Sequence, residues 1–299
     1  MIHRNLCYFF AIAMIVGVAG VFENRPSFAA STMVSDLASK THFHGIAVDP
    51  TDSSRVYLAT HHGLYVVAPD GGADRISATT DDFMGFTPHP SDPSILYASG
   101  HPASGGNLGV IASQNGGESW AKLADGVGGP VDFHQMDVSK ADPNVIYGVH
   151  GGLQRSADGG LTWTKMGPVP DGLIDLAASG KDANALYAAT KSGLYKSIDG
   201  GQSWRLAHVI KRPATMVQVS GQGDAYAFIF GIGLVRADDG GVNWRLVSKA
   251  FGGAYVSHLA VDRKDGRKIY AVAVNPETRA QSVLVSNDKG TTWAALGAD

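Results

Sequence analysis

The stretch SADGGLTW at residues 156–163 occurs five times in this chain, with small changes. The other copies read SQNGGESW at 113–120, SIDGGQSW at 197–204, ADDGGVNW at 237–244 and SNDKGTTW at 286–293. All five tryptophans of the chain end these copies, and successive tryptophans lie 43, 41, 40 and 49 residues apart. That spacing is the period of a four-stranded propeller blade. The sequence therefore predicts a protein built from repeated blades.

A second repeated feature is a short apolar strand with a tyrosine near its centre. Such runs, separated by Gly, Asn, Asp and Pro, are typical of an all-β fold. The strand occurs six times, one more than the tryptophan stretch. The first repeat keeps the turn at residues 69–72 but has no tryptophan. The six tyrosines are Tyr57, Tyr97, Tyr147, Tyr187, Tyr226 and Tyr270. We predict a single all-β domain over residues 42–299, a six-bladed β-propeller with four-stranded blades.

The eight-residue stretch is an Asp-box, and over residues 42–293 the chain resembles the BNR/Asp-box propellers, which include sialidases, sortilin-type receptors and photosystem II assembly factors. The resemblance implies that each box forms the turn between the third and fourth strands of a blade. Its Asp or Asn side chain can accept backbone N–H groups, its glycines allow positive φ, and its tryptophan packs between blades. We expect structural roles for Asn115, Trp120, Asp158, Trp163, Asp199, Trp204, Asp239, Trp244, Asp288 and Trp293.

The first 29 residues have the pattern of a signal peptide. An apolar run at 6–22 precedes Ser-Phe-Ala at 27–29, a small-x-small cleavage pattern. An uncleaved anchor is the alternative, although the run is short for a membrane span. Both interpretations predict export to the periplasm or beyond. Residues 30–41 are expected to be a linker or a closing strand, with the last blade closing on its own strand as the other possibility.

The cysteine content and the charge balance exclude some classes of partner and of cross-link. The only cysteine, Cys7, lies in the predicted signal peptide, so the exported part has none for disulfides. Without residues 1–29 the chain has 22 basic and 26 acidic residues. That balance does not suit nucleic acid or an anionic membrane surface. We expect a monomer that has no stable membrane insertion after cleavage.

Because the resemblance includes sialidases, catalysis must be tested against the residues. A sialidase-like site needs an arginine triad, but the predicted first strands at 42–49, 83–89, 133–139, 173–179, 216–220 and 255–262 contain no arginine, and the Arg-Ile-Pro motif is missing. A general glycosidase needs two carboxyl groups about 5–10 Å apart. The candidates are Asp82 and Asp132, with Asp137 and Asp175 nearby, unless these acids only cap strand ends. We predict a non-catalytic binding or assembly scaffold, with a glycoside hydrolase of the sialidase-like superfamily as the alternative.

The histidines cluster at two repeat-equivalent places. Some begin first strands and others end second strands, which are neighbouring ends in an antiparallel hairpin. They therefore share one face of the disc, opposite the Asp-boxes. The predicted ligand face consists of His42, His44, His61, His62, Met84, His101, His134, His150 and His258.

Imidazoles and thioethers suit a borderline transition metal, so copper or zinc is the candidate cofactor of this face. The candidate metal ligands are His44, His61, His134, His150 and His258. The alternative is that these histidines hydrogen-bond the backbone at strand ends. The expected partner at the same face is a protein, or a small-molecule or glycan ligand.

Overall fold

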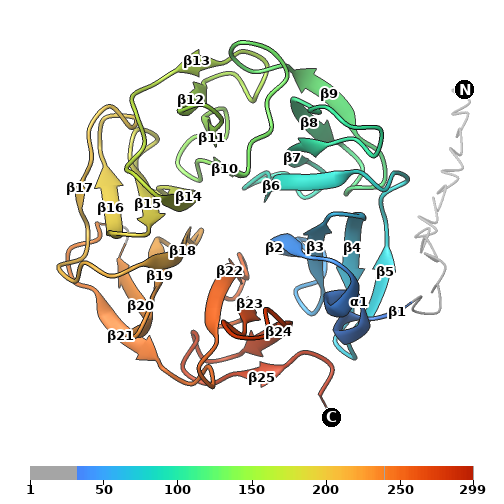
Figure 1. Cartoon of the computed structure of the whole chain (residues 1–299), viewed down its shortest axis with the longest axis vertical. Coiled ribbons are helices and arrows are strands. Elements are labelled where there is room, and N and C mark those ends of the chain that lie inside the picture. Colours follow the sequence, from blue (N-terminus) through green and yellow to red (C-terminus); the bar gives the residue numbers. More distant parts are fainter. Residues whose placement is uncertain (1–31, 239, 299) are drawn as a thin grey trace, which may run out of the picture.

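The computed structural model describes residues 32–238 and 240–298. They form a ring of six antiparallel sheets around a central channel (Figure 1). The predicted six-bladed, all-β propeller is confirmed. The predicted signal peptide and Asp239 lie outside the described residues. Within the described part, no helix is long and apolar enough to cross a membrane.

Each blade is a meander of four strands in sequence order, with the first strand next to the channel. Blade 1 consists of β2 (Phe43–Val48), β3 (Val56–Thr60), β4 (Gly63–Val67) and β5 (Gly72–Arg75). Blade 2 consists of β6 (Asp82–Pro88), β7 (Leu96–His101), β8 (Val110–Ser113) and β9 (Ala121–Ala124). Blade 3 consists of β10 (Gln135–Val138), β11 (Ile146–Val149), β12 (Leu153–Ser156) and β13 (Thr164–Lys165).

The second half of the ring repeats this order. Blade 4 consists of β14 (Leu173–Ala178), β15 (Leu186–Thr190), β16 (Gly193–Ser197) and β17 (Arg205–Leu206). Blade 5 consists of β18 (Ala214–Val219), β19 (Asp224–Ile229), β20 (Gly233–Asp238) and β21 (Arg245–Ser248). Blade 6 consists of β22 (Tyr255–Val261), β23 (Ile269–Val274), β24 (Gln281–Ser286) and β25 (Ala294–Ala295).

The hydrophobic core is divided among the interfaces between neighbouring blades. The repeated tyrosines of the second strands are part of it: Tyr147, Tyr187 and Tyr226 have no exposed surface. Tryptophans of the boxes extend these interfaces, since the ring of Trp120 lies 4.8 Å from Phe83. Alternating apolar residues therefore serve the contacts between blades, and the strand ends are left to form the two faces of the disc.

The box at residues 156–163 shows why the repeated residue types are needed. It connects β12 to β13, the predicted place between third and fourth strands. Asp158 accepts hydrogen bonds from the hydroxyl of Ser156 and from the N–H and hydroxyl of Thr162, at 2.6–2.8 Å. The Thr162 groups lower the pKa of Asp158 to about 2. Trp163 Nε1 donates to the Gly160 carbonyl at 2.9 Å. The same carboxylate or amide acceptor recurs at Asn115, Asp199 and Asp288.

Replacing Ser156 with alanine is expected to lower the free energy of unfolding by about 1–3 kcal/mol. Its hydroxyl oxygen is fully buried and accepts the Gly160 N–H at 2.9 Å, so the variant leaves that N–H unpaired. Urea unfolding measures the loss. Ser91→Ala removes an exposed hydroxyl and is expected to change stability by less than about 0.5 kcal/mol. Equal losses in both variants would contradict a structural role for the box serine.

The ring closes without sharing strands between the first and last blades. The last blade keeps its own outer strand, β25. Residues 32–33 form a short strand, β1 (Thr32–Met33), that pairs outside β5 of blade 1. The helix α1 (Val34–Lys40) follows it and was not predicted.

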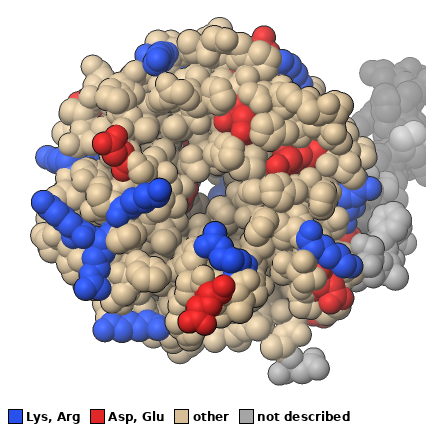
Figure 2. Space-filling model, in the orientation of Figure 1, with Lys and Arg blue, Asp and Glu red and all other residues tan. Residues whose placement is uncertain are grey.

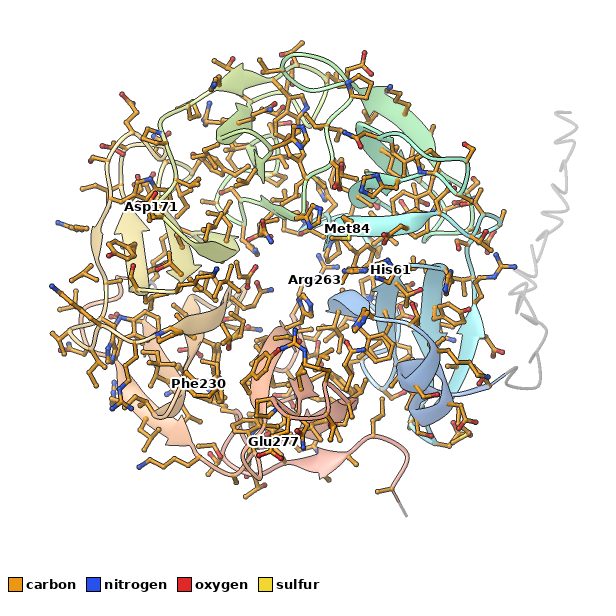
Figure 3. All side chains as sticks on the ribbon, in the orientation of Figure 1. His61, Met84, Asp171, Phe230, Arg263 and Glu277 are labelled. Atoms are coloured by element: carbon orange, nitrogen blue, oxygen red, sulfur yellow. The ribbon has the colours of Figure 1, made fainter. Side chains whose placement is uncertain are left out.

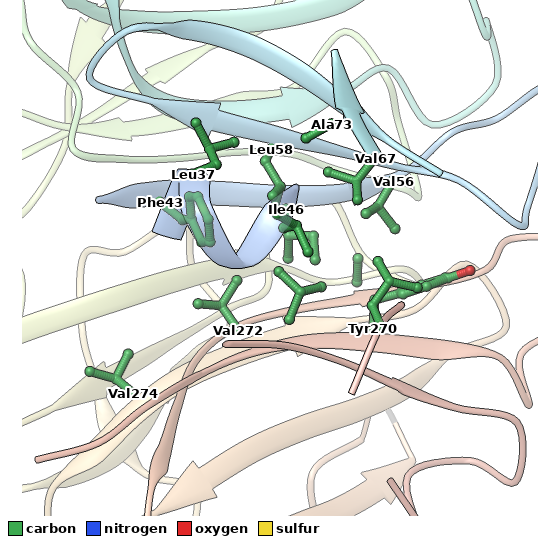
Figure 4. Packing of buried hydrophobic residues seen from close by; sticks show 14 residues of the cluster. Leu37, Phe43, Ile46, Val56, Leu58, Val67, Ala73, Tyr270, Val272 and Val274 are labelled. Atoms are coloured by element: carbon green, nitrogen blue, oxygen red, sulfur yellow. The ribbon is translucent and has the colours of Figure 1, made fainter. Parts of the chain in front are cut away.

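Side chains of α1 and the two terminal blades join in one hydrophobic cluster (Figure 4). Leu37 from the helix, Phe43 from β2 and Val272 from β23 are all buried in it. Hydrogen bonds support the same junction: Gln281 of blade 6 accepts from the Phe43 N–H at 3.0 Å and donates to the Thr41 carbonyl at 3.1 Å. The helix therefore acts as a clamp across the seam of the ring.

Candidate functional site at the histidine mouth

One end of the channel, here named the histidine mouth, is where first strands begin and second strands end. It opens into a cavity of about 570 Å³ that is lined by residues of all six blades. Figure 2 looks along the channel and shows it open at the centre of the disc. In Figure 3, His61 and Met84 lie on the side of blades 1 and 2, whereas Phe230 and Glu277 lie over blades 5 and 6.

Three side chains from blades 1 and 2, His44, His61 and Asp82, form cluster A. The Nε2 atoms of His44 and His61 lie 3.2 Å apart. His61 donates from Nδ1 to Asp82 Oδ2 at 2.7 Å, because a carboxylate oxygen can only accept. The other oxygen, Asp82 Oδ1, lies 3.5 Å from His44 Nε2. The three side chains thus offer ligand atoms that all lie within 4.8 Å of one another.

Cluster B consists of His101 from blade 2, with Asp132 and His134 from blade 3. His134 Nε2 lies 2.7 Å from Asp132 Oδ2, and His101 Nε2 lies 3.0 Å from the same oxygen. His101 also contacts the Gly106 carbonyl through Nδ1 at 2.8 Å. Asp132 is only 7% exposed, so its charge is held largely out of water. The cluster places two imidazoles around one buried carboxylate.

The strand pair β6–β7 places the two clusters next to each other. Asp82 of cluster A and His101 of cluster B are directly opposite in that pair. Gly100 makes the close approach possible: it has φ +118°, and a Cβ there would lie 2.0 Å from the Asp82 carbonyl oxygen. A larger residue would push the strands apart. The two clusters therefore form one continuous wall of the mouth, across blades 1 to 3.

Two of the five predicted metal ligands lie outside both clusters. His258 pairs with Val272, just as Gly45, the residue after His44, pairs with Ala59. His258 therefore occupies the position of Gly45 and not that of His44. His258 Nε2 then lies 3.2 Å from the Phe43 carbonyl, across the seam of the ring.

His150 takes a backbone role as well. Its Nδ1 lies 3.1 Å from the carbonyl oxygen of Asp132 and does not join the carboxylate. The structure thus brings His44 and His61 together in cluster A and places His134 in cluster B. The backbone-bonding alternative applies to His150 and His258.

The remaining predicted residues of this face surround the clusters. The His42 ring lies 5.8 Å from the His61 ring in an edge-on contact, and His62 is exposed. Met84 is buried in β6 and belongs to neither cluster. Asp82 and Asp132 were predicted only as weak catalytic candidates. Their role as carboxylate partners of histidines was not predicted, although both precede the apolar start of an inner strand.

In the metal-free protein we expect His44 and His258 to stay neutral at about pH 5.5, while His134 is protonated. Burial, and then the neighbouring His61, lowers the pKa of His44 to about 3; burial lowers that of His258 to about 4. The hydrogen bond to Asp132 raises the pKa of His134. Imidazole ¹H–¹⁵N spectra recorded against pH measure all three.

The signs of the stability effects follow from these shifts. Unfolded histidine takes up its proton near pH 6.5, so the stability that neutral His44 and His258 contribute is present above that pH and is lost as the pH falls toward 4 and 3. The contribution of His134 has the opposite sign: it is present below pH 6.5 and is lost as the pH rises through the raised pKa. Titration of His44 above pH 6 would contradict the described geometry.

Two further acids of the channel, Asp137 and Asp175, are bound to the backbone of the next blade. Asp137 accepts from the Ala178 N–H at 2.9 Å and from Lys140 Nζ at 2.5 Å. Asp175 accepts the Val217 N–H at 2.9 Å. Burial raises the pKa of Asp175 to about 7. These carboxyl groups connect blades 3, 4 and 5.

The opposite wall of the mouth has a different character. Phe230 follows β19 and is 46% exposed, and Tyr255 begins β22. Arg279, in the turn after β23, has φ 63°, an uncommon value for a residue other than glycine. All three line the cavity. The mouth therefore combines a histidine and carboxylate wall with an aromatic and cationic wall.

Comparisons with known proteins agree on the fold and divide on activity. No family model matches the chain. A xyloglucanase from Hypocrea jecorina is 24% identical over 246 residues, which cover 71% of this chain and 26% of that protein. The chain thus spans about a quarter of the length of this curated relative.

Two solved structures share the propeller fold. A gluconolactonase from Xanthomonas campestris has a TM-score of 0.59 and 14% identity, over 82% of this chain and 86% of that one. A structure described as YCF48 bound to D1 peptide has a TM-score of 0.51 and 14% identity, over 85% and 82%. At these identities the two structures show a shared fold.

Proposed function

We propose that this chain is an exported Asp-box propeller that acts as a non-catalytic binding or assembly scaffold. Its ligand is a segment of a partner protein that enters the histidine mouth. Propellers hold such surfaces on a rigid ring, although a fold alone does not define an activity.

The observation that supports a non-catalytic role is the state of the four candidate acids. Asp82 and Asp132 each lie against two histidines, and Asp137 and Asp175 accept backbone N–H groups of neighbouring blades. A glycosidase needs one carboxyl group to protonate the leaving group and another to attack or to activate water. Groups that are already bound within the protein are poorly placed for either task.

The character of the mouth supports a protein ligand. The aromatic and cationic wall supplies Phe230, Tyr255 and Arg279, residue types that are enriched at protein interfaces. The nearly half-exposed Phe230 offers apolar surface that a partner side chain can cover. The peptide named in the YCF48 structure is a precedent for a ligand of this class on a propeller.

Site-specific photo-crosslinking in the source cells tests this proposal. A crosslinker at position 230 is expected to yield an adduct with one partner protein, reduced by His44→Ala and His134→Ala in the same chain. The matched control is position 161 in the Asp-box of blade 3, where Leu161 is 59% exposed on the opposite face. The same adduct from both positions, or none from position 230, would contradict binding at the mouth.

The second candidate is a glycoside hydrolase, which the xyloglucanase relative and the raised pKa of Asp175 favour. Turnover of xyloglucan or of an aryl glycoside, abolished by Asp82→Asn, Asp132→Asn or Asp175→Asn, would establish it. A panel of such substrates with no turnover supports the scaffold.

A further inference from the structure

One ring nitrogen of His101 is fixed by a backbone carbonyl, and the other faces the carboxylate of cluster B. The Gly106 carbonyl accepts from Nδ1 at 2.8 Å, so Nδ1 carries the ring proton. In neutral His101 the Nε2 lone pair would then face Asp132 Oδ2 at 3.0 Å, with two acceptors opposed. A cation between the two atoms would remove this opposition. Fixing of one ring nitrogen by a carbonyl is also how metal-binding histidines are oriented in proteins.

Cluster A has the corresponding arrangement. Asp82 fixes the proton of His61 on Nδ1, which leaves the Nε2 lone pair facing His44 Nε2 at 3.2 Å. Two nitrogen ligands that each lie about 2.0–2.1 Å from a tetrahedral ion are about 3.3–3.4 Å apart. In the metal-free protein one proton joins the two rings. A metal ion between them requires little movement of either ring.

Unsatisfied carboxylate oxygens provide a second, independent observation. Asp132 Oδ1 and Asp82 Oδ1 are both buried and have no hydrogen-bond partner among the described residues. A buried acceptor without a partner costs about 1–3 kcal/mol, more when it is charged, and calls for an explanation. The side chain of Asp132 is more than nine-tenths buried and lies between its two histidines. In cluster A the free oxygen lies 3.5 Å from His44 Nε2, within reach of a cation held there. In cluster B a cation would satisfy Asp132 Oδ1 when both oxygens of the carboxylate bind it.

We propose that clusters A and B are two adjacent binding sites for divalent transition-metal ions of the zinc and copper class. Each site supplies two imidazole nitrogens and one carboxylate, a set that suits these metals and leaves a coordination position open for water or a ligand. Calcium and magnesium prefer sites made mainly of oxygen atoms. Because Asp82 and His101 are opposed in the same strand pair, the two ions lie side by side in the wall of the mouth.

The number of zinc ions bound per chain tests this proposal directly. The protein, expressed without an affinity tag, is stripped with a chelator, loaded with Zn²⁺, freed of excess ion and analysed by mass spectrometry of the metal. One ion per cluster is expected, hence two per chain. His61→Ala should remove the ion of cluster A, and His134→Ala that of cluster B. The double variant should bind neither.

His62→Ala is the matched control, because this exposed histidine adjoins His61 but belongs to neither cluster. Its zinc content should equal that of the unchanged chain. Circular dichroism verifies the fold of each variant, and the 56% exposure of the His134 side chain makes disruption of the core by that variant unexpected. Co²⁺ loading gives a second readout, since absorption bands of bound Co²⁺ should halve in either single variant.

One zinc ion or none in the unchanged chain would overturn the paired site. So would two ions retained in the folded double variant, or equal losses in the His62→Ala control. None of these outcomes depends on a partner protein, so they are separate from the outcome of the crosslinking experiment.

Discussion

Leu37→Ala is expected to lower the free energy of unfolding by about 2–5 kcal/mol, because it leaves a cavity at the seam of the ring. Leu37 is 4% exposed and packs in the cluster that joins α1 to blades 1 and 6. The first and last blades share no strand, so this cluster and a few hydrogen bonds close the ring. Chemical unfolding followed by tryptophan fluorescence measures the loss.

Leu161→Ala is the matched control for the clamp. Leu161 is 59% exposed in an Asp-box turn, and its truncation should change stability by less than about 0.5 kcal/mol. A loss in Leu37→Ala no larger than in this control would mean that the helix does not hold the seam.

Asp137→Ala is the second variant with a large expected effect, a loss of about 3–5 kcal/mol, because it leaves the partly buried ammonium of Lys140 and the buried Ala178 N–H without their partner. Asp137 is 5% exposed and lies within 2.5 Å of Lys140 Nζ. It also accepts from the Ala178 N–H at 2.9 Å and from the Thr87 hydroxyl at 3.1 Å. The same side chain therefore links blades 2, 3 and 4, and thermal unfolding of the variant reports its contribution.

Asp137→Asn separates the parts of this network. The amide keeps an acceptor for the Ala178 N–H but loses the charge opposite Lys140, so a smaller loss is expected than for alanine. If Asp137→Ala were as stable as the unchanged chain, the carboxylate would be free for another task, and the hydrolase alternative would gain support.

The fold could be predicted because two local signals repeat. Box residues such as Asp158 and Trp163 form hydrogen bonds within their own turn, and tyrosines such as Tyr147 mark the buried second strand. The residues that determine each blade's structure therefore lie within that blade's own sequence. The helix α1 could not be predicted in this way. Its seven residues occur once, and they are helical because Val34 and Leu37 pack at the seam, a contact with residues more than 200 positions away.

The site was predicted less completely than the fold. Sequence spacing predicted histidines at one end of the blades, but it treated His258 as the equivalent of His44, whereas His258 pairs with Val272 as Gly45 pairs with Ala59, one residue later. It also missed the pairing of Asp82 with His61 and of Asp132 with His101. These contacts cross between blades, and spacing within a repeat carries no information about them.

Anomalous diffraction at the zinc absorption edge, from crystals of the zinc-loaded protein, is the most direct test that the histidine mouth is a binding site of this propeller. We predict two peaks in the wall formed by blades 1 to 3, one bound by His44 and His61 beside Asp82, the other by His101, Asp132 and His134. Zinc peaks found only at the Asp-box face or elsewhere on the surface, with none at the mouth, would contradict it.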